Sequence, residues 1–398
     1  TPRVATLLAC AGLAATLAAT AVRADELHVT AASASTNALY EISFGPTPPA
    51  GATALNATPI PPKGGSSVRS LAYISNEQTG KVDLLAADTT GGKIVRYAAA
   101  AGPALPVWAW PVAGPRATDG LSVDSQGNLY ALSSDSARNE LWVLRRDPAL
   151  PPGAGLLPPL LIDNSNFATT SRTRLLETVI VRTAIPGGPG TGDLLVLVND
   201  GRVLRYSAAS LQNFLAGARP IAPPQTLVTA AQSPTAHKAT GMALWPADGS
   251  LLVATIGGAV LRYTLTTTGS TAMPAFATGL GLSLGEIKTF VRSNVPYAVF
   301  DQPLRSKIFE FGAPPTGGCP NLAVACNTAL ATVTTVSNPV GLATTDASAP
   351  TQNCVFDTPN PDNGCTLLGG AIKLGVSSSA PGATILDASC TIDTDLRV

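Results

Sequence analysis

The sequence predicts an all-β fold, a six-bladed β-propeller, because three short phrases recur along the chain in a fixed order. The clearest copy runs from Thr118 to Leu132 and continues with Glu140–Leu144. It contains an apolar strand, a Gly/Asn turn, an alternating strand, a loop and a third strand, which together form a small antiparallel sheet. The 37 glycines and 34 prolines also favour a turn-rich β fold over a helical one.

The number of copies predicts the number of blades. Starts of the second phrase are spaced by roughly 45 to 65 residues, close to the period of a four-stranded blade. Its six copies are Leu27–Ala31, Leu84–Ala87, Leu129–Leu132, Leu194–Leu197, Leu251–Ala254 and Tyr297–Phe300. The third phrase also occurs six times, as Ala38–Ile42, Lys93–Tyr97, Glu140–Leu144, Arg202–Tyr206, Ala259–Tyr263 and Lys307–Phe311.

The first phrase is displaced. It is missing before Leu27, and a spare copy, Pro339–Thr344, follows the last full unit. A strand near Val340–Thr345 that completes the blade beginning at Leu27 would close the ring and leave no open sheet edge. Weaker apolar runs with nearby prolines fit the outer strands of the blades; they are Val107–Trp110, Leu157–Leu161, Thr226–Thr229 and Ala331–Thr335.

The two ends of the chain differ from the repeats. Residues 1–24 combine Arg3, an Ala/Leu-rich run and the small-residue site Val22–Ala24, which predicts a secretory signal peptide and a secreted or periplasmic protein. A lipoprotein box at Leu7–Cys10 is the rival interpretation, although the apolar run continues past Cys10; the alanine content and the cleavage site argue against a membrane anchor. We expect the propeller at residues 25–346 and a Cys-containing extension at 347–398.

The balance of charges limits the kinds of partner that we expect, and the cysteines indicate the compartment of the protein. With 25 basic and 25 acidic residues, the composition indicates neither nucleic acid nor an anionic membrane surface as a partner. Five cysteines follow residue 318, and they predict disulfides in an exported protein. Cys319–Cys326 and Cys354–Cys365 are the favoured short-loop pairs, which leaves Cys390 over, and other pairings stay open. Zinc is disfavoured because there is no Cys-x-x-Cys and only two histidines.

The segment Thr118–Leu132 resembles the repeat of NHL-type propellers. It is equally similar to a segment of the gluconolactonase and senescence-marker-protein family, in which the Asp before Gly binds calcium. The resemblance implies that Asp119 is a calcium ligand, and Leu284–Glu286 resembles the opening Leu-Gly-Glu of the family, whose Glu is another ligand. The surrounding Gly-Pro-x-Trp is absent, and the two Asn ligands have no counterpart.

The repeats themselves point to the same place. Residues beside each first strand border the central channel at the face where the loops converge. In the six units these residues are Arg69, Asp119, Glu177, Thr240, Glu286 and Asn338. Asp119, Glu177, Glu286 and Asn338 offer oxygen ligands of the kind Ca²⁺ prefers, and such a metal could polarise a lactone or a phosphoester. The plain alternative is that acidic residues at strand starts are ordinary turn formers.

Two functions therefore compete. The first is an exported, non-catalytic scaffold that binds a protein, a glycan or a small molecule with its loop face, where Asp163–Arg174 and Ala230–Thr240 form long loops. The second is a calcium-dependent hydrolase of the lactonase type. A quinone-dependent propeller is a third alternative, without visible metal ligands or aromatic stacking motifs. In the repeated Arg-Tyr pairs at positions 96, 205 and 262, we expect Tyr to pack between blades and Arg to face solvent.

Overall fold

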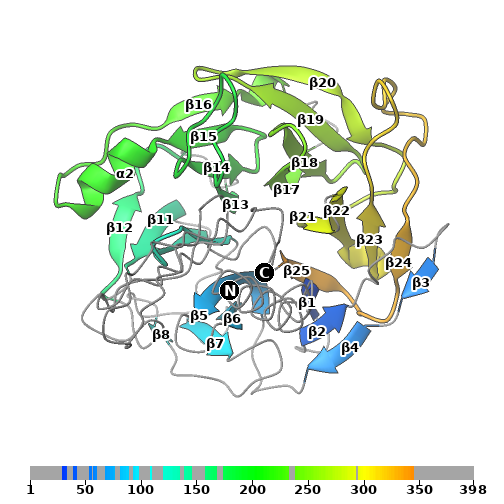
Figure 1. The fold of residues 1–398 in the computed structure, drawn as a ribbon, viewed down its shortest axis with the longest axis horizontal. Coiled ribbons are helices and arrows are strands. Elements are labelled where there is room, and N and C mark those ends of the chain that lie inside the picture. Colours follow the sequence, from blue (N-terminus) through cyan, green and yellow to red (C-terminus); the bar gives the residue numbers. More distant parts are fainter. Residues whose placement is uncertain are drawn as a thin grey trace, which may run out of the picture. The chain divides into compact units, whose positions relative to one another are not determined.

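A computed structural model describes the fold (Figure 1). The described residues are 29–33, 39–42, 53–55, 57–60, 68–76, 81–88, 93–97, 108–109, 120–134, 139–145, 157–167, 174–232, 238–292 and 295–344. Within them, one α-helix, α2 (Ala208–Leu215), and two 3-10 turns, η1 (Ala230–Gln232) and η2 (Pro303–Arg305), accompany the β-strands. The predicted all-β class is confirmed.

The described strands form six sheets, and the strands of each sheet are named below in pairing order. The first strand named in each sheet, its inner strand, contacts the inner strands of neighbouring sheets. The first sheet contains β25 (Pro339–Thr344), β1 (Val29–Ser33), β2 (Leu39–Ile42) and β4 (Ala57–Ile60). The second contains β5 (Val68–Asn76), β6 (Lys81–Asp88), β7 (Lys93–Tyr97) and β8 (Trp108–Ala109). The third contains β9 (Leu121–Val123), β10 (Leu129–Ser134), β11 (Asn139–Leu144) and β12 (Leu160–Asp163).

The remaining sheets follow in chain order (Figure 1). The fourth contains β13 (Leu175–Ile180), β14 (Leu194–Val198), β15 (Val203–Tyr206) and β16 (Gln225–Val228). The fifth contains β17 (Ala239–Leu244), β18 (Leu251–Thr255), β19 (Val260–Leu265) and β20 (Ser270–Ala277). The sixth contains β21 (Ile287–Arg292), β22 (Val295–Gln302), β23 (Lys307–Phe311), β24 (Ala331–Val333) and β3 (Thr53–Leu55).

The first and sixth sheets exchange strands. β25 pairs antiparallel with β1, with Val29 opposite Thr344, which is the pairing that the displaced phrase predicts. In the other direction, β3 pairs parallel with β24, with Thr53 opposite Ala331. No repeat in the sequence indicates this second pairing, because β3 lies between two units. Each inner strand also contacts the next, in the order β25, β5, β9, β13, β17, β21 and back to β25.

The apolar runs of the second phrase are explained by burial on both faces of the sheets. Leu194–Val198 of β14 is buried at every position. Leu194, Val196 and Val198 pack in one cluster with residues of β10 and β11. Leu195 and Leu197 pack in another cluster with residues of β18 and β19. Sheets stacked face to face leave no polar face on the central strand, so its sequence is continuously apolar rather than alternating.

The clearest repeat forms the β9–β10 hairpin, and Asp124 holds its turn. The Asp124 carboxylate accepts hydrogen bonds from the backbone N–H of Gln126 at 2.9 Å and of Asn128 at 2.8 Å. Gly127 adopts a φ of 81°, a left-handed conformation that glycine adopts without steric cost. The Asp-x-x-Gly-Asn pattern thus specifies the turn, and this acidic residue serves the fold.

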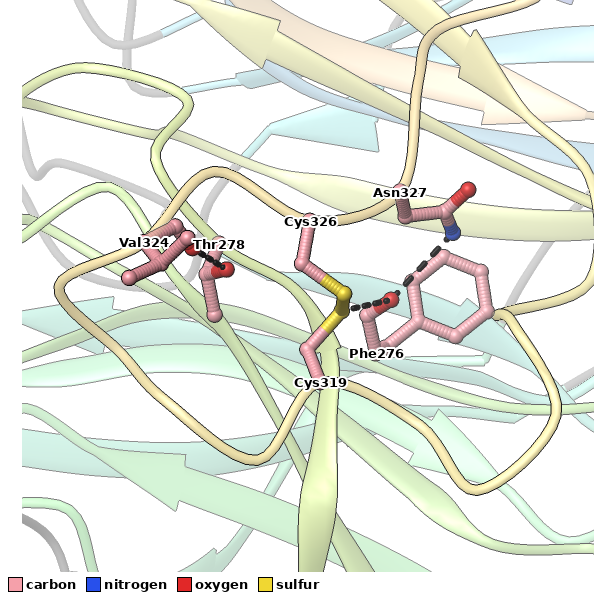
Figure 2. Close-up of a disulfide and its surroundings, with 6 residues drawn as sticks. All are labelled: Phe276, Thr278, Cys319, Val324, Cys326 and Asn327. Atoms are coloured by element: carbon pink, nitrogen blue, oxygen red, sulfur yellow. Dashed lines mark hydrogen bonds between the residues drawn. A yellow bond between two sulfur atoms is a disulfide. The ribbon is translucent and has the colours of Figure 1, made fainter.

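One predicted disulfide lies in the described residues and is confirmed. Cys319 and Cys326 are joined with a Cα–Cα distance of 5.7 Å in the loop between β23 and β24 (Figure 2). This loop forms backbone hydrogen bonds to the outer end of the fifth sheet. They make two isolated β-bridges, one between Cys319 and Ala275 and one between Cys326 and Thr278. Thr278 Oγ1 donates to the carbonyl of Val324 at 2.5 Å. The disulfide therefore stabilises a loop that covers part of the β20 edge.

Some predictions fall outside the described residues, namely the signal peptide 1–24, the extension 347–398 and Cys354, Cys365 and Cys390. One side-chain prediction is wrong: Arg96 is 1% exposed and does not face solvent. Tyr206 and Tyr263 are buried, as predicted. Arg205 and Arg262 are only partly exposed, because each pairs with a carboxylate, Asp193 or Asp248. No helix among the described residues is long and apolar enough to cross a membrane.

Candidate functional site

A buried lysine joins two carboxylates predicted as metal ligands. Lys288 of β21 donates a hydrogen bond from Nζ to Glu177 Oε2 of β13 at 3.0 Å. The same Nζ lies 2.8 Å from Oε1 of Glu286, which directly precedes β21. Asp301 of β22 completes this group, because its Oδ1 accepts a hydrogen bond from the Glu286 backbone N–H at 2.7 Å. We call these four residues the Lys288 cluster.

Glycines let the strands that carry the cluster approach closely. A Cβ on Gly241 of β17 would lie 2.9 Å from Glu286 Cα, and a Cβ on Gly120 would lie 2.9 Å from Glu177 Cα. Real Cβ atoms do not come this close to backbone, so only glycine fits at either position. β17 contacts both β13 and β21. The close approach of these strands explains how a lysine of the sixth sheet reaches a carboxylate of the fourth.

The cluster connects three sheets. Glu177 belongs to the fourth sheet, where its Oε1 also accepts from the Thr178 N–H at 3.1 Å. Lys288 belongs to the sixth. Glu286 Oε2 accepts a short hydrogen bond from the backbone N–H of Leu342, in β25 of the first sheet. Glu177 is 1% and Asp301 0% exposed, so these contacts form away from bulk water.

Burial sets the protonation of the carboxyl groups. It raises the pKa of Glu177 well above its usual range, and Glu286 raises it further, while Lys288 acts in the opposite direction. Burial also raises the pKa of Asp301 well above its usual range, with a further contribution from the Glu286 charge. Burial alone would lower the pKa of Lys288, but the Glu177 and Glu286 carboxylates outweigh it, so the net pKa is raised. The Lys288 ammonium therefore lies beside two carboxyl groups, Glu177 and Asp301, that release their protons at a higher pH than usual.

The raised pKa values of Glu177 and Asp301 predict that the Lys288 cluster stabilises the protein more at mildly acid pH than at pH 8. Unfolded Glu and Asp titrate near pH 4. Glu177 and Asp301 keep their protons to higher pH in the folded chain, so between the two pKa values the native state binds more protons than the unfolded state. The free energy of unfolding must then fall as the pH rises through this window. Lys288, with its raised pKa, contributes stability that is lost only at strongly alkaline pH.

Urea unfolding of the wild type at pH 5 and pH 8 measures this dependence. Other groups titrate as well, so the matched control is the double variant Glu177→Gln/Asp301→Asn, which cannot release these two protons. We expect the free energy of unfolding to fall more steeply with pH in the wild type than in this variant. Equal slopes in the two proteins would show that Glu177 and Asp301 are already ionised in the native state at pH 5.

The predicted metal ligands have different surroundings in the structure. Glu177 and Glu286 come together, but around Lys288. Asn338 lies before β25 with a φ of 46°, and its N–H donates to Ser306 Oγ at 3.0 Å. Asp119 is outside the described residues. Within the described ranges, no three His, Cys, Asp or Glu side chains are grouped as a metal site.

Lys288 and Asp301 were missing from the sequence-based site. The sequence does contain a signal for Lys288, because it is a single cation in the strand Ile287–Phe290. It lies two residues after Glu286, so both side chains point to the same face of the sheet. Asp301 directly follows the apolar run Tyr297–Phe300, where the sequence indicates only the end of a strand. The Oδ2 atom of Asp301 is buried without a hydrogen-bond partner, and this environment disfavours the charged form of the carboxyl group.

A pocket of about 420 Å³ lies elsewhere, at the outer end of the third sheet. We call it the β12 pocket. One wall is formed by β12 and the turn after it, including Leu161, Asn164 and Ser165. The opposite wall is formed by Phe214 of α2 and by Arg219 and Ile221 in the segment that follows. Ser207 Oγ caps α2 by accepting from the Ser210 N–H at 3.2 Å, and this fixes the helix that presents Phe214.

Comparison with known proteins supports the fold. No family model matches the sequence, and no curated protein matches it. A chain in the crystal structure of the nidogen/laminin complex is similar with a TM-score of 0.51 and 10% identity, over 80% of this chain and 98% of that one. This chain therefore has a β-propeller fold.

Two further structures are similar at lower scores. A protein from Lactobacillus plantarum gives a TM-score of 0.47 at 14% identity, over 79% of this chain and 86% of that chain. A putative 6-phosphogluconolactonase from Bacteroides uniformis gives 0.44 at 11% identity, over 80% of this chain and 99% of that chain.

Proposed function

We propose that this chain is an exported β-propeller that acts as a binding scaffold, with the six sheets serving as the six blades of a closed ring. The pairing of β25 with β1 and of β3 with β24 supports closure, because each of the two end sheets receives a strand from the other end of the chain. The Cys319–Cys326 disulfide supports export, since disulfides persist in oxidising compartments. Secretion or a periplasmic location follows from the predicted signal peptide.

The observation that carries the proposal is the position of the Lys288 ammonium. A calcium-dependent hydrolase would use Glu177 and Glu286 to bind the metal, together with Asp119 and Asn338. In this chain Nζ lies 3.0 Å from Glu177 and 2.8 Å from Glu286. A divalent cation between these carboxylates would meet a buried positive charge, and the carboxylates already have their counter-charge. The two glutamates do not fit a calcium site in this arrangement, so we assign them to the stability of the ring.

Metal analysis tests the scaffold against the calcium-dependent hydrolase. The purified mature protein should contain no stoichiometric calcium. Calcium should leave its melting temperature unchanged, and the protein should not hydrolyse gluconolactone. A real site, at a calcium concentration a hundredfold above its Kd, would stabilise the protein by about 2.7 kcal/mol. A calcium-dependent rise in melting temperature that Asp119→Ala removes, together with lactone turnover, would overturn the proposal.

The variant Lys288→Gln is the matched control for this measurement. It removes the competing ammonium and keeps a polar side chain of similar length. If Lys288 is what excludes a cation from the two glutamates, this variant should gain a calcium-dependent rise in melting temperature that the wild type lacks. A variant that folds but stays insensitive to calcium would mean that Glu177 and Glu286 do not form a cation site even without the lysine.

A further inference from the structure

The β12 pocket contains an arginine that is held in place but has no acidic partner. The Arg219 guanidinium carbon lies 3.6 Å from the centre of the Phe214 ring, so cation and ring are stacked. Its Nη1 donates to the carbonyl of Ala218 at 2.9 Å and, in a shorter bond, to that of Phe214. Within the described part of the chain, no carboxylate pairs with Arg219. Arg219 is exposed, and its Nε and Nη2 groups have no acceptor among the described residues, so they can donate to a ligand.

The acidic residue of the same pocket is already satisfied. Asp163 Oδ1 accepts from the Ser165 N–H at 2.8 Å, from Ser165 Oγ at 3.1 Å and from the Asn166 N–H at 3.3 Å. Its Oδ2 accepts from Tyr206 OH at 2.5 Å and from Asn166 Nδ2 at 2.7 Å. The carboxylate thus shapes the turn between Asp163 and Asn166. Its charge is spread over these donors, which leaves Arg219 as the group that an incoming anion would meet.

The other walls of the pocket add two further preferences. Asn164 and Ser165 are exposed and carry an amide and a hydroxyl, which bind ligand hydroxyl groups. Leu161 is half-buried and supplies the apolar surface on which the face of a ring can pack, while Phe214 lies beneath Arg219 and Ile221 is 8% exposed. The volume of about 420 Å³ lies in the range of small-molecule sites. A carboxylate, several hydroxyls and an apolar ring face occur together in a sugar acid.

We propose that the β12 pocket binds a carboxylated sugar unit, a uronic acid of a glycan, through Arg219. The carboxylate accepts two hydrogen bonds from the Nε and Nη2 side of the guanidinium, the pairing for which the planar guanidinium group is suited. Asn164 and Ser165 bind the sugar hydroxyls, and the ring packs against Leu161. This assignment rests on the proposed scaffold function and gives it a ligand class.

A matched pair of ligands tests the assignment. Methyl glucuronide and methyl glucoside differ only in the carboxylate, and titration calorimetry with the intact purified protein compares them. We expect saturable binding of the glucuronide, at least tenfold tighter than binding of the glucoside, with the ligand recovered unchanged. Binding of the glucoside alone, equal binding of the two, or no binding of either would overturn the assignment.

Variants locate the site. Arg219→Gln should weaken glucuronide binding at least tenfold, and Arg219→Lys should weaken it less, because charge remains but the planar donor pair is lost. Arg219 also anchors the Phe214 carbonyl, so the exposed Asn164→Leu is a second variant that leaves this anchor intact; it should weaken binding severalfold. Arg202→Gln, at an arginine paired with Asp200 outside the pocket, is the control and should bind as the wild type does.

Undiminished binding in both Arg219 variants and in Asn164→Leu would place the sugar elsewhere and refute the assignment. The scaffold function is tested separately by calcium and lactone turnover. Failure of either proposal is therefore distinguishable from failure of the other.

Discussion

Replacing Lys288 by Met should lower the free energy of unfolding by about 3 to 5 kcal/mol, the cost of removing one partner from a buried ion pair. Lys288 is 9% exposed, and its ammonium is shared between Glu177 and Glu286. Methionine keeps most of the volume and removes the charge. The two carboxyl groups would then be buried against each other without a counter-charge, and contacts among three sheets would weaken together.

Urea unfolding at pH 7 measures this loss, and two other variants make it specific. Lys238→Met is the same substitution at an exposed lysine and should change the free energy of unfolding by less than about 0.5 kcal/mol. Glu177→Gln should cost less than Lys288→Met, because Glu286 still pairs with the ammonium and the amide oxygen still accepts from Nζ. A loss below about 1 kcal/mol for Lys288→Met would mean that water reaches the cluster and screens its charges.

The strands were predictable because each repeat satisfies a local requirement. Leu194–Val198 is apolar throughout since both faces of β14 are covered, and the Asp124–Asn128 turn contains its own hydrogen-bonding side chain. The predicted outer strands at 107–110, 226–229 and 331–335 overlap β8, β16 and β24. By contrast, β3 was not predictable. Its partner β24 lies more than two hundred residues away, and a three-residue strand has no periodicity to detect.

The site was predictable only in part, because its contacts also join residues that are far apart in the chain. The repeat alignment put Glu177 and Glu286 at corresponding positions, and the structure does bring them to one lysine. The partner of Glu177 is 111 residues away, and no local pattern shows which of the many charges in other blades it meets. Arg96 was wrongly expected at the surface because an Arg-Tyr repeat predicts alternation but not what covers each face. The β12 pocket joins two loops, at 163–166 and 219–221, that lie outside every repeated phrase.

Replacing Gly258 by Ala should lower the free energy of unfolding by about 2 to 5 kcal/mol, from backbone strain and from a collision. Gly258 turns the chain between β18 and β19 with a φ of 79°. A Cβ there would lie 2.2 Å from the carbonyl oxygen of Gly281. That carbonyl belongs to the loop that leads from β20 to Glu286, and the loop is held by the bond from the Leu280 N–H to the Gly258 carbonyl at 3.1 Å.

Gly317→Ala separates the two causes. Gly317 has a φ of 85°, close to that of Gly258, but a Cβ there would meet nothing within 4 Å. It should therefore cost only the left-handed strain, about 1 to 2 kcal/mol. The excess loss in Gly258→Ala then measures the collision with the 279–285 segment. Because that segment positions Glu286, the collision should also move Glu286 relative to Lys288, and the pH dependence of unfolding should become shallower in Gly258→Ala but not in Gly317→Ala. Equal losses and equal pH slopes in the two variants would show that the segment yields freely, and that the Lys288 cluster does not depend on its packing against the β18–β19 turn.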